Sequence, residues 1–264
     1  MRSLASAALN VLTASNPREK AILAQKVLAD WQAGVIAFEF DAMPPDRPGR
    51  PDRPELLAPS AMPKRRKGGN DANRIALLHA IAHIELNAID LAFDIVARFG
   101  VKMPRAFSDD WIRVGADEGR HFSMLEVRLG ELGSFYGDLP AHDGLWQSSE
   151  QTAHHLPARL AVVPMVLEAR GLDVTPGMIT RFENSGDNAS AVILRTIYED
   201  EVGHVAAGKI WFDFLAKEQN KDSETWFHAL VREYFAGDLK RPFNTQAREK
   251  AGLFPSFYEP LADS

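Results

Sequence analysis

Apolar residues recur at helical spacing over most of this chain, and no stretch shows the sustained apolar and polar alternation of half-buried strands. Four long segments with an apolar face are predicted helices, and a shorter helix is predicted on each side of them. In chain order the predicted helices cover residues 17–31, 71–99, 108–132, 157–172, 187–217 and 223–235. We therefore expect an all-α protein.

Capping residues and prolines indicate where several of these helices begin, bend and end. Ser108 is a suitable N-cap for the helix that Gly133 should end. Pro164 should kink the third long helix. Residues 176–184, with Thr175 as a suitable cap, should form a continuation of the third helix or an extra turn after it.

The connections predict how the helices are paired. Residues 41–70 are rich in Pro and Arg and should form a long extended arm without regular structure. Residues 134–155 form a long connection between the second and third long helices, whereas the links inside each pair are shorter. Two helix pairs joined by one long crossover correspond to the ferritin-like four-helix bundle. We expect a single domain over residues 1–264, with its core at about 71–217 and a C-terminal extension at about 218–264.

The amino-acid composition limits the kinds of binding and metal chemistry that the chain can perform. The 264 residues are 45% hydrophobic and 25% charged, and the formal charge of −6 argues against a general binder of nucleic acid. The chain has no cysteine, which excludes thiolate metal sites, iron–sulfur clusters and thiol nucleophiles. Any metal site must therefore use nitrogen and oxygen ligands. The N-terminal residues lack a signal-like apolar region, so we expect a cytoplasmic protein without membrane attachment.

The motif Glu-x-x-His occurs twice, as Glu118 with His121 and as Glu201 with His204. Residues three apart lie on one face of a helix, so each pair can reach a common point. A single copy of this motif is more often part of a solvated face. Here the neighbours on each face are small or apolar, which predicts that both pairs point inward.

Glu85 and Glu168 are lone acids on the other two long helices, also among apolar neighbours at helical spacing. We expect both to be buried. Glu85 precedes Glu118 by 33 residues, since 118 − 85 = 33, and Glu168 precedes Glu201 by the same number, since 201 − 168 = 33. The chain therefore resembles a diverged duplication in which each half supplies one Glu and one Glu-x-x-His, the ligand set of dinuclear carboxylate bundles.

Four carboxylates in a dry core need counter-charge, because desolvation costs several kcal/mol per ion. Two divalent metal ions would neutralise them, with His121 and His204 as neutral ligands. Asp117 and Asp200 each precede a ligand Glu directly. We expect them to accept the free ring N–H of the metal-bound histidines across the pair, Asp117 from His204 and Asp200 from His121.

The sequence resembles the ferritin-like superfamily, and more closely an uncharacterised bacterial family known as domain of unknown function 455. The segments that carry this resemblance are "HIELNAIDLAFDI" (83–95), "DEGRHFSMLEVRL" (117–129), "EARGLDVTP" (168–176), "YEDEVGHVAAG" (198–208) and "KRPFNTQAREKAG" (240–252). All six ligand positions of the superfamily pattern are filled. They are Glu85, Glu118, His121, Glu168, Glu201 and His204.

The resemblance implies a di-iron oxidoreductase that activates dioxygen or peroxide, as a hydroxylase or monooxygenase does, with electrons from a separate reductase. Superfamily members include a tRNA-modifying monooxygenase, so we expect an unidentified small-molecule or tRNA-type substrate. Rival functions are a ferroxidase, a manganese catalase and a non-enzymatic interaction module with a structural metal pair. Iron is preferred over manganese as the metal, although the ligands suit both. A homodimer is left open.

Other polar residues have simpler interpretations. His79 and His83 lie off the Glu85 face and should be packing or surface residues, and His154 and His155 should form a polar helix start. Tyr198, three residues before Glu201, is a weak candidate for a catalytic side chain and is more simply a core tyrosine with a satisfied hydroxyl. The basic run at 64–69 is most simply a solvated loop; if the substrate were tRNA, that run and Lys240–Arg241 would be its contacts.

Overall fold

The computed structural model describes residues 2–63 and 71–262, and most of these residues are helical. The chain divides into two compact units, residues 1–146 and 147–264, and each unit is described separately. The all-α prediction is confirmed. The basic run at 64–69 lies outside the described residues.

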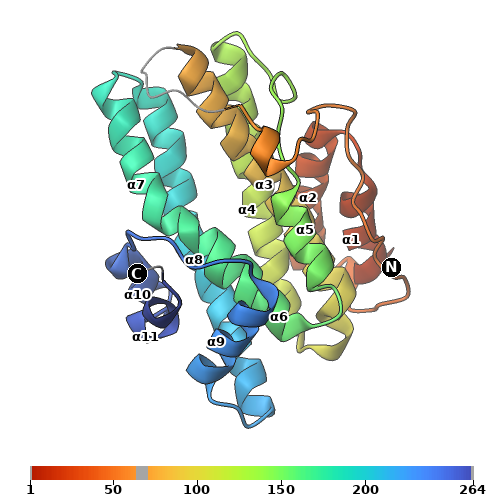
Figure 1. Ribbon diagram of the computed structural model, residues 1–264. Coiled ribbons are helices and arrows are strands. Elements are labelled where there is room, and N and C mark those ends of the chain that lie inside the picture. Colours follow the sequence, from red (N-terminus) through yellow and green to blue (C-terminus); the bar gives the residue numbers. More distant parts are fainter. Residues whose placement is uncertain (1, 64–70, 263–264) are drawn as a thin grey trace. The chain divides into compact units, whose positions relative to one another are not determined.

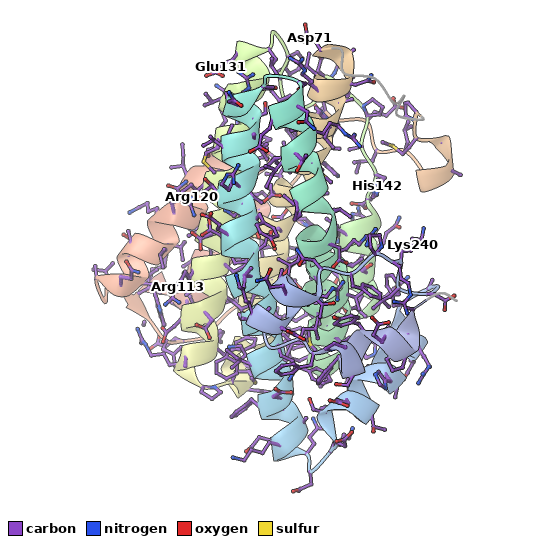
Figure 2. All side chains as sticks on the ribbon, turned by 90° about the vertical axis from the view of Figure 1, so that its left-hand side faces the viewer. Asp71, Arg113, Arg120, Glu131, His142 and Lys240 are labelled. Carbon is purple, nitrogen blue, oxygen red and sulfur yellow. The ribbon has the colours of Figure 1, made fainter. Side chains whose placement is uncertain are left out.

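The first unit is built around two long antiparallel helices, α3 (Asp71–Phe99) and α4 (Arg105–Glu131), joined by the short turn η2 (Gly100–Lys102). Asp71 and Glu131, at opposite ends of their helices, lie at the same end of the pair (Figure 2). The helices α1 (Leu4–Thr13) and α2 (Pro17–Gln32) pack beside them (Figure 1). A short parallel pairing joins β1 (Arg2–Ser3) to β2 (Ile36–Ala37). Helix α1 and this pairing were not predicted.

Helix α3 was predicted with its observed bounds, but the start of α4 was wrong. Helix α4 begins at Arg105, directly after Pro104, and Ser108 is fully buried inside it instead of capping it. The earlier start brings Phe107 into the helix, where it is shielded from solvent together with Trp111. Gly133 does end α4, with a φ of +77° that favours glycine.

The window of α3 and its continuation, Asp71–Lys102, is long and apolar enough to cross a membrane by composition alone. Within the fold, 72% of its most apolar stretch is buried. The same helix also buries acidic side chains, among them Asp90 and Asp94. These features indicate packing inside a protein core.

The arm at 41–63 has no long helix or strand, as predicted, apart from the turn η1 (Pro59–Ala61). It is nevertheless fixed to the first unit. Arg50 contributes an ion pair of 2.8 Å to Asp90 and a hydrogen bond of 2.6 Å to Asn87, both on α3. Lys20 of α2 pairs with the same Asp90 carboxylate. The backbone of the arm also bonds to Ala141 in the crossover.

Two buried histidines of α3 fix the crossover at residues 136–142. His79 Nε2 accepts hydrogen bonds from the backbone of Gly137 at 2.9 Å and of Leu139 at 3.4 Å. His83 Nε2 lies 3.1 Å from the carbonyl of His142 and 3.1 Å from the Asn87 side-chain amide, and Nδ1 lies 2.8 Å from the Tyr136 hydroxyl. Both histidines are therefore packing residues, as the sequence suggested.

The second unit contains a nearly continuous helical rod and its antiparallel partner. The rod consists of α6 (Leu156–Val162), a π-helical segment η3 (Val163–Glu168) and α7 (Ala169–Asn184), and its partner is α8 (Asn188–Glu218). Helices α9 (Ser223–Tyr234), α10 (Thr245–Lys250) and α11 (Pro255–Tyr258) and the turn η4 (Glu259–Leu261) complete the unit (Figure 1). Helix α5 (Gly144–Gln151) contains the division between the units.

The predicted kink at Pro164 appears as the π-helical segment, a form that accommodates one extra residue in the turn. Residues 176–184 continue α7, which was one of the two predicted forms, so Thr175 lies inside the helix and does not cap it. His155 occupies the position before α6, and both His154 and His155 contact the ring of Tyr234. The polar helix start predicted there is confirmed.

Asp90→Asn should lower the free energy of unfolding by about 3–5 kcal/mol, because it leaves two cationic groups beside a neutral amide in the core. Asp30→Asn breaks the exposed Lys26–Asp30 pair and should cost less than about 1 kcal/mol. Urea unfolding at neutral pH gives both values. Equal effects of the two substitutions would contradict the importance of the buried pairing.

His83 should make the first unit sensitive to acid. Burial lowers the pKa of His83 from 6.5 to about 4. As the pH falls, the His83 imidazole therefore takes up a proton at higher pH in the unfolded chain than in the folded protein. The stability that the neutral histidine contributes is lost as the pH falls from about 6.5 through about 4. By linkage the loss is about 3 kcal/mol.

His83→Gln should remove this part of the acid destabilisation, measured as the difference between its unfolding free energy and that of the wild type from pH 7 to pH 4. His154→Gln, at an exposed histidine, is the control and should keep the wild-type dependence. The assignment fails if His83→Gln also keeps it.

Candidate metal centre

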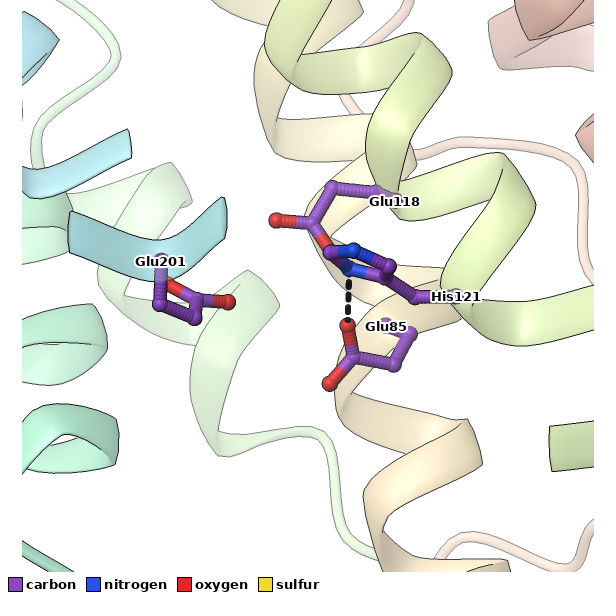
Figure 3. A group of neighbouring side chains, drawn as sticks. All are labelled: Glu85, Glu118, His121 and Glu201. Carbon is purple, nitrogen blue, oxygen red and sulfur yellow. Dashed lines mark hydrogen bonds and ion pairs between the residues drawn. The ribbon is translucent and has the colours of Figure 1, made fainter. Parts of the chain in front are cut away.

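The first unit brings three of the predicted ligands together. Glu85 of α3 and Glu118 and His121 of α4 face one another between the two helices (Figure 3). Their ligand atoms lie within 4.8 Å of one another. Glu118 and His121 have no exposed surface and Glu85 has 3%. The predictions that Glu85 is buried and that the first Glu-x-x-His pair points inward are confirmed.

Helix packing explains how these side chains meet. The Glu-x-x-His spacing places Glu118 and His121 on the buried face of α4, together with Trp111 and Gly115. A side chain at Gly115 would lie 2.6 Å from the ring of Phe93 on α3, so glycine permits the close approach of the helices. The ligand pair of α4 is thereby held against Glu85 of α3.

The distances fit donor atoms around one cation. His121 Nδ1 lies 3.1 Å from Glu85 Oε2 and 3.3 Å from Glu118 Oε2. Donor atoms about 2.1 Å from one ion lie about 3.0 Å apart in an octahedral arrangement and about 3.4 Å apart in a tetrahedral one. A single ring N–H cannot satisfy two carboxylates equally, whereas a cation can.

The electrostatics of the cluster also favour a cation. Burial raises the pKa of Glu85 well above its usual value, and the nearby charge of Glu118 raises it further, while the hydrogen bond from His121 lowers it. The protein without metal therefore keeps Glu85 protonated to higher pH than a solvated glutamate. Binding of a divalent cation would displace that proton.

The second unit supplies the other three predicted ligands on η3 and α8. Glu168 ends the π-helical segment, and its Oε2 atom is shielded from solvent although the residue as a whole is half-buried. His204 is 3% exposed, and its Nδ1 atom lies 3.8 Å from Glu201 Oε2. The Glu201 side chain is 13% exposed. Burial is therefore less complete for the acids of this unit than was predicted.

A glycine again permits the close approach of two helices. A side chain at Gly208, one turn after His204, would lie 2.5 Å from the ring atoms of Pro164. Helix α8 thus packs directly against the segment that ends at Glu168. Each unit therefore repeats one plan, in which a lone Glu stands on one helix and a Glu-x-x-His on the next.

The remaining predicted site residues have defined surroundings. Asp117 accepts a hydrogen bond of 3.0 Å from Arg120, one turn later on α4. Asp200 directly precedes Glu201 on α8 and is half-buried. The Tyr198 hydroxyl accepts a hydrogen bond of 3.0 Å from Asn244 in the tail, so the expectation of a satisfied hydroxyl is confirmed. Asn244 was not predicted from the sequence. Its signal was Pro176, which lies inside an otherwise helical segment and removes a backbone N–H donor there.

Comparison with known proteins places the chain among uncharacterised relatives. A family model described as "Protein of unknown function (DUF455)" matches residues 13–259. An "Uncharacterized protein" of Haemophilus influenzae is 38% identical over 253 residues, which cover 92% of this chain and 88% of the relative. No solved structure matches the chain.

Glu85→Gln should stabilise the metal-free protein above pH 5. Because the folded-state pKa of Glu85 is raised, its stabilising proton is fully present at low pH and is lost as the pH rises through that value. Between the usual pKa of a glutamate and the raised folded-state pKa of Glu85, the stability advantage of the variant should grow by up to about 1.4 kcal/mol per pH unit. Above the folded-state pKa the wild type loses no further stability, so the advantage stays constant.

Urea unfolding of chelator-treated protein between pH 4 and pH 9 measures this advantage. Glu131→Gln, at an exposed acid on α4, is the control and should follow the wild type. A Glu85→Gln variant that is less stable than the wild type throughout this range would contradict the account of the cluster.

Proposed function

The chain belongs to the DUF455 family, and we propose that it is a dinuclear-metal oxidoreductase of the ferritin-like type, with iron as the preferred metal. The observation that carries the proposal is the buried contact of His121 with both Glu85 and Glu118. Two carboxylates and an imidazole without solvent contact suit a divalent cation and no apolar ligand.

We propose one dinuclear centre inside a ferritin-like four-helix bundle, as the sequence predicts. The equal spacing of 33 residues in each half and the balance of charge support this centre. Four carboxylates carry four negative charges, which two divalent ions neutralise. The ligands are those predicted from the sequence, Glu85, Glu118, His121, Glu168, Glu201 and His204.

The side chains have distinct parts in this function. The four glutamates hold the ions, and neutral His121 and His204 complete the ligand set. Asp117 and Asp200 hold these imidazoles in one orientation by accepting the ring N–H, which stays a prediction. The apolar face around Trp111, Val114 and Phe122 excludes water from the first half of the centre.

The four glutamates and two histidines would hold the iron pair, which when reduced would supply electrons to dioxygen or peroxide, while the protein would control access and orientation. We propose that an organic molecule is oxidised as in hydroxylases and monooxygenases, with electrons from a separate reductase. A cytoplasmic location and the absence of membrane attachment belong to the same proposal. The reaction class follows from the superfamily resemblance, because fold alone does not determine chemistry.

The direct test is oxygen consumption by Fe(II)-loaded protein with an excess of a chemical reductant. The wild type should consume oxygen over many turnovers, because the reductant regenerates the ferrous centre. Glu118→Gln and Glu201→Gln should lose at least 90% of this rate, since each replaces a charged ligand by a neutral amide.

Glu199→Gln is the matched control on α8, at an exposed acid two residues before Glu201, and should retain the wild-type rate. Oxygen uptake that stops once an amount proportional to the added Fe(II) has been consumed would instead indicate a ferroxidase. Peroxide disproportionation by the Mn(II) form without reductant would indicate a catalase. An uptake rate that Glu118→Gln and Glu201→Gln leave unchanged contradicts the proposal.

A further inference from the structure

Asn244, in the tail just before α10, connects the two ligand-bearing helical segments of the second unit. Its Nδ2 group donates to the Leu172 carbonyl at 3.1 Å and to the Tyr198 hydroxyl at 3.0 Å. Leu172 lies one turn after Glu168, and Tyr198 lies three residues before Glu201. One amide therefore reaches both segments within about a turn of each ligand.

The Leu172 carbonyl needs this donor because of a proline. In an α-helix, that carbonyl would accept the N–H of residue 176, four residues later. Residue 176 is Pro176, which has no N–H, although α7 continues through it. Asn244 supplies a hydrogen bond to this carbonyl, which lost its helical donor.

Asparagine fits this position by its full set of polar groups. Its two amide hydrogens serve Leu172 and Tyr198, and its Oδ1 atom accepts from the backbone N–H of Ala247, where it caps α10. Its own backbone N–H donates to Asp173 at 2.9 Å. An aspartate would keep the cap but lose both donors.

A buried ion pair fixes the tail in this position. Arg248 of α10 donates to both carboxylate oxygens of Asp173, at 2.8 and 2.7 Å, and both side chains are almost fully shielded from solvent. Arg170 donates to the carbonyls of Lys240 and Pro242. The tail is therefore bonded to α7 on both sides of Asn244.

We propose that Asn244 is a positioning residue for the metal ligands of the second unit. By tying Leu172 to Tyr198 it fixes the rotation and spacing of the segments that carry Glu168 and Glu201. This inference rests on the proposed dinuclear centre. It gives the C-terminal tail a role in metal binding, although the tail carries none of the ligand motifs.

Asn244→Ser tests the proposal without removing the helix cap, because serine is also a good N-cap. In anaerobic Fe(II) titrations, the variant should bind one of its two ions about tenfold more weakly, and the other within about twofold of the wild type. Co(II) titrations should show a changed absorption spectrum for the weakened ion. Gln246→Ser, at an exposed position of α10, is the matched control and should behave as the wild type.

Pro176→Ala supplies a rescue, since alanine restores the backbone N–H that Leu172 lacks. In the Asn244→Ser background it should recover part of the lost affinity. Tyr198→Phe removes the hydrogen bond from Asn244 to Tyr198 while leaving Asn244 in place, so it should also lower the affinity for one ion. It replaces Asn244→Ser as the test if that variant folds poorly.

The outcomes separate this inference from the proposed function. A wild type that binds no metal overturns both. A wild type with two ions, whose affinities and Co(II) spectrum are unchanged in Asn244→Ser and in Tyr198→Phe, overturns only the role of Asn244. Equal weakening of both ions, with a matching fall in the melting temperature, would show a general structural role and also overturn it.

Discussion

The cost of burying carboxylates is the constraint on which the functional interpretation of this molecule depends. Glu85 and Glu118 face each other across two helices in a space without solvent, and His121 is the imidazole between them. Such a group of acids opposes folding unless protons or cations accompany it. A sequence that maintains these acids among apolar neighbours gives up stability, which a bound cation would restore.

The same unit also buries another acid, whose charge is compensated by cationic side chains of the protein itself. Asp90, also on α3, is surrounded by Lys20 from α2 and Arg50 from the arm, so its charge is balanced within the protein. The contrast between Asp90 and the Glu85 cluster is informative. Where the fold needs a buried acid for structure it provides cations, and at Glu85 and Glu118 the neighbouring group is a histidine that suits a metal ion.

Much of the architecture could be predicted because helix formation and ligand spacing are local. The bounds of α3, α8 and α9 followed from apolar periodicity and from ending residues, and the contact of Glu85 with Glu118 and His121 followed from placing a lone acid opposite a Glu-x-x-His pair. The errors arose where distant residues decide local structure. Thr175 is not a cap and the helix continues past it, the other form that the sequence allowed, because Asn244, about 70 residues away, supports the carbonyl that Pro176 leaves without its helical donor. Ser108 is not a cap, because burial of Phe107 and Trp111 extends the helix to Arg105.

Metal content measures the central claim most directly. Protein reconstituted anaerobically with Fe(II), and in parallel with Mn(II), is freed of loosely bound ions and analysed by plasma mass spectrometry. The account predicts two ions per chain in the wild type, iron preferred, and clear loss in Glu201→Ala. A wild type that retains no tightly bound metal, or a Glu201→Ala variant that keeps both ions, would contradict it.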